Sequence, residues 1–353
     1  MAMLLCIVIS ALVLHHDKGP GTISNMLSCS RIFLAIGCLS ACFLIPIRSV
    51  EAVPVVHRDT EASREVEEIL ENLSPAERVG QVFVVTFQGT SVAEDTPIFT
   101  MLSRKNVGGL VLSANNDNFD DRDDILRATR QLTDQLQRAA FEASRWSIDE
   151  TSLTKPLLVD NYVPLLIGVS HEGNGFPYTE LIGGVTPLPS SMAVGATWSN
   201  EASTMIGEIA GYELSQLGIN LLLGPNLDVL QVPHPANPGD PGVRSFGGHQ
   251  YWVSQLGKAY IKGIHMGSKG RMAVIPMAFP GTGAADRSTE INIPSISKSM
   301  EELLQIDMVP FAAVTDVEQD SFFVADGLMP SQARYTSLQG SLSNSTRPLS
   351  LDG

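Results

Sequence analysis

Four polar segments that contain glycine or proline each directly follow a short apolar run, and they carry the residues best suited to chemistry. They are Ser170-His171-Glu172-Gly173-Asn174-Gly175, Pro225-Asn226-Leu227-Asp228, Phe279-Pro280-Gly281-Thr282-Gly283 and Asp326-Gly327. In a sheet of parallel strands, the carboxyl ends present their side chains to one common crevice. We therefore expect the carboxylate, imidazole, amide and hydroxyl groups of these segments to line a ligand site.

The elements that must position these segments alternate along the chain. The apolar runs are candidates for buried strands and cover residues 82–85, 107–112, 165–169, 219–223, 272–275 and 322–325. The helical stretches between them cover residues 95–105, 125–145, 201–217, 251–265 and 299–310. This alternation predicts an α/β fold with a parallel sheet and outer helices, either a barrel or a doubly wound sheet.

An acidic stretch leads into the first of these units. Residues 61–71 have a helical pattern rich in glutamate, so we expect a lead-in helix within residues 53–72. Ser74 can then cap a second helix, Pro75 fits its first turn, and Glu77 completes a capping box. The main domain is expected to begin at residue 73 and to occupy residues 73–353.

Charge and cysteine distribution exclude several classes of function. The 353 residues have a formal net charge of −15, which argues against a nucleic-acid or anionic-lipid partner. The four cysteines are Cys6, Cys29, Cys38 and Cys42. Because no cysteine follows Cys42, thiol catalysis, disulfides and cysteine-based zinc sites are excluded for the residues after position 42. The sequence has neither a glycine-rich dinucleotide loop nor a Gly-x-Ser-x-Gly motif, so no nucleotide cofactor is expected.

The N-terminal segment has the pattern of an export signal. Its apolar runs, residues 3–14 and 32–47, are both shorter than the roughly 20 residues of a membrane-spanning helix. Arg31 precedes the second run, and Ser49-Val50-Glu51-Ala52 follows it. A charged start, an apolar centre and a small-residue exit are typical of a secretory signal.

We therefore expect residues 1–52 to direct export to the cell envelope or the exterior, with cleavage after Ala52. Met26 begins a complete signal by itself and is an alternative start. One competing interpretation is a lipoprotein signal processed at Cys42, which would anchor the protein to a membrane by a lipid. Another is a buried core helix.

Several motifs follow one another in a fixed order in the second half of the chain. They are residues 188–197 (L-P-S-S-M-A-V-G-A-T), residues 213–228 (E-L-S-Q-L-G-I-N-L-L-L-G-P-N-L-D), Gly242-Val243-Arg244-Ser245-Phe246-Gly247, Phe279-Pro280-Gly281 and Asp307-Met308-Val309-Pro310-Phe311. In this order they resemble glycoside hydrolase family 3, and specifically the N-terminal barrel domain of the β-N-acetylglucosaminidase type. The resemblance covers residues 73–351.

The resemblance implies a TIM (β/α)8-type barrel with an exo-acting site at the carboxyl ends of its strands. It also implies hydrolysis of a β-linked amino sugar or glucoside with retention of configuration, and no metal or organic cofactor. Retaining hydrolysis classically uses two carboxyl groups about 5 Å apart. In this subfamily the proton donor is thought to be a histidine paired with an aspartate.

The matched positions supply candidate site residues, each with a structural alternative. Arg244 is expected to clamp sugar hydroxyls, or else to brace its loop. Asp228 is expected to bind ligand, or else to cap the proline-rich loop that follows it. Glu172 is expected to brace its loop beside the sugar. Asp286 is the one candidate catalytic group, as the partner of a proton donor, and the alternative is a solvated loop aspartate.

Several family positions are occupied by different residue types here. The pattern Lys-His-Phe-Pro-Gly-His-Gly becomes residues 277–283 (M-A-F-P-G-T-G), so that Met277 makes one wall of the pocket apolar. The pattern Asp-x-Glu-Gly becomes Ser170-His171-Glu172-Gly173, and His171 does not replace the lost carboxylate. Asp-x-His becomes Asp286-Arg287-Ser288, and a later Ser-His becomes Ser331-Gln332.

Two functions are therefore expected as alternatives, with a non-expressed gene remnant as a third. The first is an exported glycosidase-type protein with a carbohydrate substrate. The second is a catalytically inactive carbohydrate-binding or scaffolding homologue, favoured by the residues in the family's Lys and His positions: Met277, Ala278, Thr282, Ser288 and Gln332. About six of the eight strands are expected within the chain, and the family's nucleophilic aspartate, which follows the seventh strand, is expected beyond its end.

Overall fold

The computed structural model describes residues 5–6, 61–119, 124–144, 162–173, 175, 178–234, 241–287, 292–339 and 348–351. The expected export signal lies outside these residues except for Leu5 and Cys6, which form the two-residue strand β1 (Leu5–Cys6) antiparallel to β2 (Phe83–Thr86). Helix α1 spans Glu61–Asn72. Among the helices of the described residues, none is both long and apolar enough to cross a membrane.

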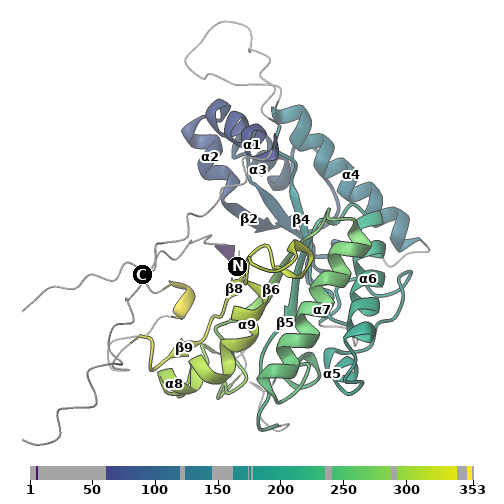
Figure 1. Ribbon diagram of the computed structural model, residues 1–353. Helices are drawn as coiled ribbons and strands as arrows, with labels where there is room; N and C mark the ends of the chain where they lie inside the picture. Colours follow the sequence, from purple (N-terminus) through teal and green to yellow (C-terminus); the bar gives the residue numbers. More distant parts are fainter. Residues whose placement is uncertain are drawn as a thin grey trace, which may run out of the picture. The chain divides into compact units, whose positions relative to one another are not determined.

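Six parallel strands form one curled sheet, which is open on one side like part of a barrel (Figure 1). In spatial order they are β2, β3 (Gly109–Val111), β4 (Leu166–Val169), β5 (Leu221–Asn226), β6 (Ala273–Phe279) and β8 (Met329–Pro330). A separate two-stranded sheet pairs β7 (Ser295–Ile296) with β9 (Arg334–Tyr335). The expected α/β barrel-type architecture is therefore confirmed, and the doubly wound sheet is excluded.

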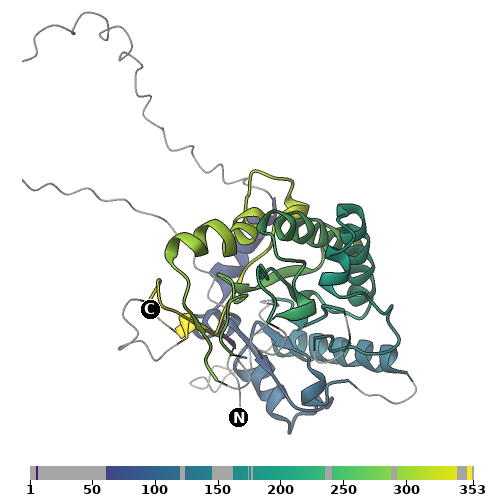
Figure 2. The same ribbon diagram turned by 90° about the horizontal axis from the view of Figure 1, so that it is seen from below.

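Helices alternate with the strands and line the outer side of the curled sheet, as the turned view in Figure 2 also shows. They are α2 (Pro75–Gln81), α3 (Pro97–Arg104), α4 (Ile125–Ser144), α5 (Ser191–Gly195), α6 (Asn200–Gln216), α7 (Gln250–Ser268), α8 (Met300–Glu302) and α9 (Val309–Val314). The capping box predicted for Ser74 and Glu77 is present at the start of α2. A π-helical turn, Leu303–Asp307, joins α8 to α9.

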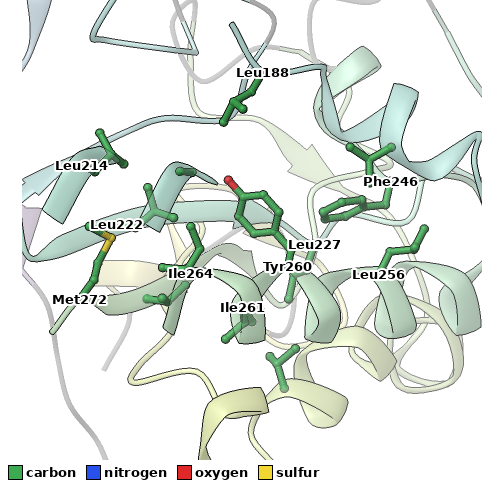
Figure 3. Packing of buried hydrophobic residues seen from close by; sticks show 14 of the residues in the cluster. Leu188, Leu214, Leu222, Leu227, Phe246, Leu256, Tyr260, Ile261, Ile264 and Met272 are labelled. Atoms are coloured by element: carbon green, nitrogen blue, oxygen red, sulfur yellow. The ribbon is translucent and has the colours of Figure 1, made fainter. Parts of the chain in front are cut away.

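The buried core lies mainly between the sheet and its outer helices. Successive residues of β5 point to opposite faces. Leu222 packs outward against residues of α6 and α7, whereas Leu221 and Leu223 pack inward with Ile275. Figure 3 shows the outer cluster, in which Tyr260 of α7 lies among leucine and isoleucine side chains. This two-layered packing fixes the strand ends on which the site residues are carried.

The prediction for the last strand is wrong. Residues 322–325 were expected to form a strand followed by Asp326 at its carboxyl end, but Ser321–Phe323 is a 3-10 turn and the strand is β8. The two phenylalanines instead cover α7: Phe322 lies edge-on to His265 with 6.2 Å between ring centroids, and the Lys262 ammonium lies 4.6 Å from the centroid of the Phe323 ring. Asp326 therefore lies at the amino end of the sheet, beside Val274 near the start of β6.

Candidate functional site

The carboxyl ends of three neighbouring strands bring Glu172, Arg244 and Met277 together. Glu172 follows β4, Arg244 lies on the 3-10 turn η2 (Gly242–Arg244) in the connection after β5, and Met277 belongs to β6. Arg244 Nε donates to Glu172 Oε2 at 2.6 Å, and Nη2 donates to Oε1 at 2.7 Å. Nη2 also lies 3.2 Å from the sulfur of Met277. Residues that are far apart in the chain therefore meet at one edge, as expected from their positions.

The loop that carries Arg244 is held by its neighbour Ser245. The buried hydroxyl of Ser245 donates to the backbone carbonyls of Asp228 and Gly247, at 2.7 and 2.9 Å. On the other side, the Arg244 guanidinium lies 4.4 Å from the centroid of the Tyr178 ring. A planar cation held by a two-point ion pair and an aromatic face has little freedom to reorient.

The charges of this pair stabilise each other in a mostly dry environment. The side chain of Glu172 is 2% exposed and that of Arg244 is 24% exposed. Burial by itself would lower the pKa of Arg244, but the hydrogen bonds and the charge of Glu172 outweigh it, so the pKa is raised. Arg244 therefore remains charged, and the pair as a whole is neutral.

Asp228 forms a second group at the same edge and is fully enclosed. Its carboxylate accepts hydrogen bonds from the backbone N–H and the hydroxyl of Thr282, the latter at 2.6 Å, and from the amide of Asn226 at 3.1 Å. Burial raises the pKa of Asp228, and these hydrogen bonds counteract only part of that rise. The Asp228 carboxylate therefore accepts three hydrogen bonds from protein groups.

A third carboxylate supports the turn that carries Thr282. Asp307, 1% exposed, pairs with Lys298 at 2.7 Å, and it packs against Gly281. A Cβ atom at Gly281 would lie 2.7 Å from Cβ of Asp307, and the φ of +127° is also one that glycine favours. The hydroxyl of Tyr335 donates to the Gly281 carbonyl at 2.8 Å. The glycine in the Phe-Pro-Gly motif is thus required by close packing.

Two of the candidate residues occupy other environments. His171 is 3% exposed, its Nδ1 has no hydrogen-bond partner in the described structure, and burial lowers its pKa to about 4. Asp286 lies at the surface, where it pairs with Arg287 at 2.7 Å and accepts from the Ser295 N–H. The hydrogen bonds from Arg287 lower the pKa of Asp286, so this carboxyl group is ill suited to hold a proton.

A cavity of about 380 Å³ lies at the opposite end of the sheet. Asp326 and His265 line it, with 3.0 Å between Asp326 Oδ2 and His265 Nε2. Burial by itself would lower the pKa of His265, but the hydrogen bonds to Asp326 and to the Phe322 carbonyl, together with the charge of Asp326, outweigh it and raise the pKa. Within the described residues, no group of three or more His, Cys, Asp or Glu side chains could hold a metal ion.

Sequence reasoning missed Tyr178, and it named Thr282 without its partner. Tyr178 lies against Arg244, and Thr282 supplies two donors to Asp228. No local pattern identifies Tyr178, because its partner is 66 positions away (244 − 178). Thr282 stands at a family histidine position, and its threonine hydroxyl could have indicated an internal hydrogen bond.

Known proteins with similar sequences and folds are named beta-hexosaminidases and beta-N-acetylglucosaminidases. The chain is 27% identical over 222 residues to beta-hexosaminidase A of Pseudoalteromonas piscicida, covering 61% of this chain and 31% of that protein. It is 31% identical over 154 residues to a beta-hexosaminidase of Neisseria gonorrhoeae, covering 42% of this chain and 40% of the relative. The chain thus spans about a third to two fifths of the length of these curated relatives.

A solved structure, a glycoside hydrolase family 3 beta-N-acetylglucosaminidase from a Paenibacillus species, has a similar fold. Its TM-score is 0.61 at 26% sequence identity, and the match covers 78% of this chain and 44% of that one. The model of the glycosyl hydrolase family 3 N-terminal domain matches residues 74–352. Glu172, Tyr178, Asp228, Arg244, Met277 and Thr282 together are called the strand-end site below. Because the match covers most of the chain, including the whole sheet from β2 to β8 and this site, the chain belongs to glycosyl hydrolase family 3.

Proposed function

We propose that the strand-end site binds the terminal residue of a β-linked N-acetylhexosaminide or glucoside, with Arg244 as the principal ligand of its hydroxyl groups. The observation that carries this proposal is the ion pair between Glu172, which follows β4, and Arg244, in the connection after β5. Glu172 takes Nε and one Nη2 hydrogen, and Nη1 makes no hydrogen bond to any described residue. We propose that these two Nη1 hydrogens are donated to the ligand.

The charge of the site supports a neutral ligand over an anionic one. Arg244 is already neutralised by Glu172, so that an additional carboxylate or phosphate would meet no net positive charge. A neutral polyol needs only directed donors, and a guanidinium fixed between Glu172 and the Tyr178 ring supplies them with little loss of conformational entropy. Vicinal sugar hydroxyls match the spacing of such donors.

The relatives' names suggest hydrolysis, which needs a proton donor and a nucleophile. We propose that these two groups are not supplied by the described carboxylates of the site. Glu172 is paired with Arg244, Asp228 accepts from Thr282 and Asn226, and Asp307 is paired with Lys298. This same observation favours the second candidate function, a carbohydrate-binding homologue without turnover.

Calorimetric titration with N-acetylglucosamine and with glucose tests the binding proposal. We expect binding to the wild type and its loss in Arg244→Gln, with Arg244→Lys intermediate because lysine keeps the charge but not the fork. Arg287→Gln, at an exposed ion pair, is the matched control and should bind as the wild type does. Equal binding by folded wild type and folded Arg244→Gln, or no binding of either sugar by the wild type, would refute the proposal.

Turnover separates the two candidate functions. An aryl β-N-acetylglucosaminide is offered to the protein isolated from its native source. If the wild type releases the aryl group and the Arg244→Gln variant does not, the protein is a glycosidase. Sugar binding without release identifies the non-catalytic homologue.

We also propose that residues 1–52 direct export of the protein. The order of Arg31, the apolar residues 32–47 and Ser49-Val50-Glu51-Ala52 supports this proposal. N-terminal sequencing of the protein recovered outside the cytoplasm should begin at Val53. Recovery in the cytoplasm with residues 26–52 intact would refute it.

A further inference from the structure

Three aromatic side chains gather at the amino ends of α6 and α7. Trp198 lies two residues before α6, and Tyr251 and Trp252 lie in the first turn of α7. The rings of Trp198 and Trp252 are 4.9 Å apart at 88°, and those of Tyr251 and Trp252 are 5.3 Å apart at 81°. These three residues are called the aromatic platform below.

The platform leaves large apolar rings in water. Trp198 is 59% exposed and Tyr251 is 54% exposed, while Trp252 between them is partly buried. Edge-to-face contact with Trp252 holds the outer two rings, so that their faces are displayed in fixed directions. Exposed aromatic surface that is grouped and held in this way is characteristic of a binding surface.

The backbone at Trp198 provides an independent observation. Its φ is +54°, in the left-handed region that glycine and asparagine adopt easily and that costs other residues about 1 kcal/mol or more. Ser199 then caps α6 by accepting from the Ala202 N–H at 3.1 Å. The turn before α6 thus carries a bulky ring in a conformation that a smaller residue would adopt with less strain.

Close packing of two parallel helices brings the platform together. Gly207 and Gly211 of α6 face Tyr260 and Ile264 of α7, and a Cβ atom at either glycine would lie 2.3 Å from a carbonyl oxygen of α7. The helices therefore approach closely along their length, with their amino ends side by side. In a β–α unit, the helix begins at the carboxyl end of the preceding strand, so the platform lies at the same end of the fold as the strand-end site.

A direct structural connection joins the platform to that site. Helix α5 ends three residues before Trp198, and it packs against η2, the turn that carries Arg244. The contact is tight, because a Cβ atom at Gly195 would overlap the carbonyl oxygen of Phe246. Figure 1 shows α5 at the lower end of the α6 and α7 pair.

We infer that the aromatic platform is a second saccharide-binding surface, on which further sugar rings of a β-linked polymer stack when its terminal residue lies at Arg244. This inference rests on the proposed function of the strand-end site. The apolar faces of pyranose rings fit exposed Trp198 and Tyr251, and the neighbouring exposed Asn200 offers an amide to sugar hydroxyls. A neutral polymer also meets no repulsion from a protein of net charge −15.

The test compares the affinities of the full chain for N-acetylglucosamine and for its β-1,4-linked tetramer. We expect the tetramer to bind the wild type about tenfold more tightly than the monomer, which corresponds to about 1.4 kcal/mol. Trp198→Asn keeps a residue that tolerates the left-handed backbone, and Tyr251→Ala removes the second ring. Either change should reduce the tetramer's advantage and leave monomer affinity unchanged.

Tyr212→Ala is the matched control, since Tyr212 is 56% exposed but lies towards the other end of α6. An advantage of the tetramer that persists in Trp198→Asn and Tyr251→Ala would overturn the inference. A wild-type dimer that becomes monomeric in either variant, measured by light scattering, would also overturn it by identifying the platform as a self-association surface. Failure of the proposed function would give a different result from failure of this inference. Binding of the monomer would then be absent, or it would be unchanged in Arg244→Gln.

Discussion

Replacing Glu172 by glutamine should destabilise the fold markedly, because it leaves the buried charge of Arg244 without its partner. The glutamine has nearly the same volume as the glutamate but no charge. Removing one partner of a buried pair costs about 3 to 5 kcal/mol, and the lower end applies here because Arg244 retains 24% exposure. We therefore expect the free energy of unfolding to fall by about 3 kcal/mol. Arg244→Gln should cost a similar amount by leaving the Glu172 carboxylate unpaired.

The double variant Glu172→Gln/Arg244→Gln completes the cycle. Because neither charge is then left alone, it should lose clearly less than the sum of the two single losses. Unfolding in urea, followed by circular dichroism with linear extrapolation, measures each value. Arg287→Gln, at a pair whose partners are 44% and 40% exposed, should change stability by less than about 0.5 kcal/mol. Additive single losses, or a Glu172→Gln loss as small as this control's, would refute the reasoning.

Three further predictions concern buried polar groups. Thr282→Val removes a donor from enclosed Asp228 and should cost about 2 kcal/mol in urea unfolding. His171, with a pKa of about 4 against 6.5 in the unfolded chain, should lower stability progressively as the pH falls from 6.5 to 4, by about 3 kcal/mol, and His171→Phe should abolish that part of the pH profile. His265 acts in the opposite direction, since its pKa is raised: its contribution is fully present below pH 6.5 and is lost as the pH rises through the raised folded-state pKa. Asp326→Asn should therefore destabilise the fold more below pH 6.5 than well above it, which unfolding at the two pH values measures.

The sequence allowed most of the scaffold to be predicted because its signals are local. The capping box of Ser74 and Glu77 depends on residues three positions apart, and five of the six apolar runs became strands of the sheet. The failure at residues 322–325 has a tertiary cause. A short apolar run indicates burial but not the element that buries it, and here Phe322 and Phe323 cover α7 instead of extending the sheet.

The site was predictable as a set of positions but not as a set of contacts. Glu172 and Asp228 were expected at the carboxyl ends of strands, and Arg244 and Met277 were expected near them from the family resemblance. The structure brings all four to that end of the sheet. The ion pair between Glu172 and Arg244 was not predicted. The two residues are 72 positions apart, and no local sequence pattern indicates that they are in contact. Long-range ion pairs follow from strand order, which the alternation of elements leaves open between a barrel and a doubly wound sheet.

Two of the residues at the altered family positions, Thr282 and Met277, make contacts inside the protein. Thr282 stands where the family pattern has a histidine, and both of its donors are used by Asp228. Met277 stands where that pattern has a lysine, and its sulfur lies against Nη2 of Arg244. Such contacts keep the buried charges satisfied by protein groups, so these residues are compatible with the fold. On the proposed function, affinity for a saccharide then depends on Arg244 for the terminal residue and on surfaces outside the altered motif, such as the aromatic platform, for the additional affinity of a polymer.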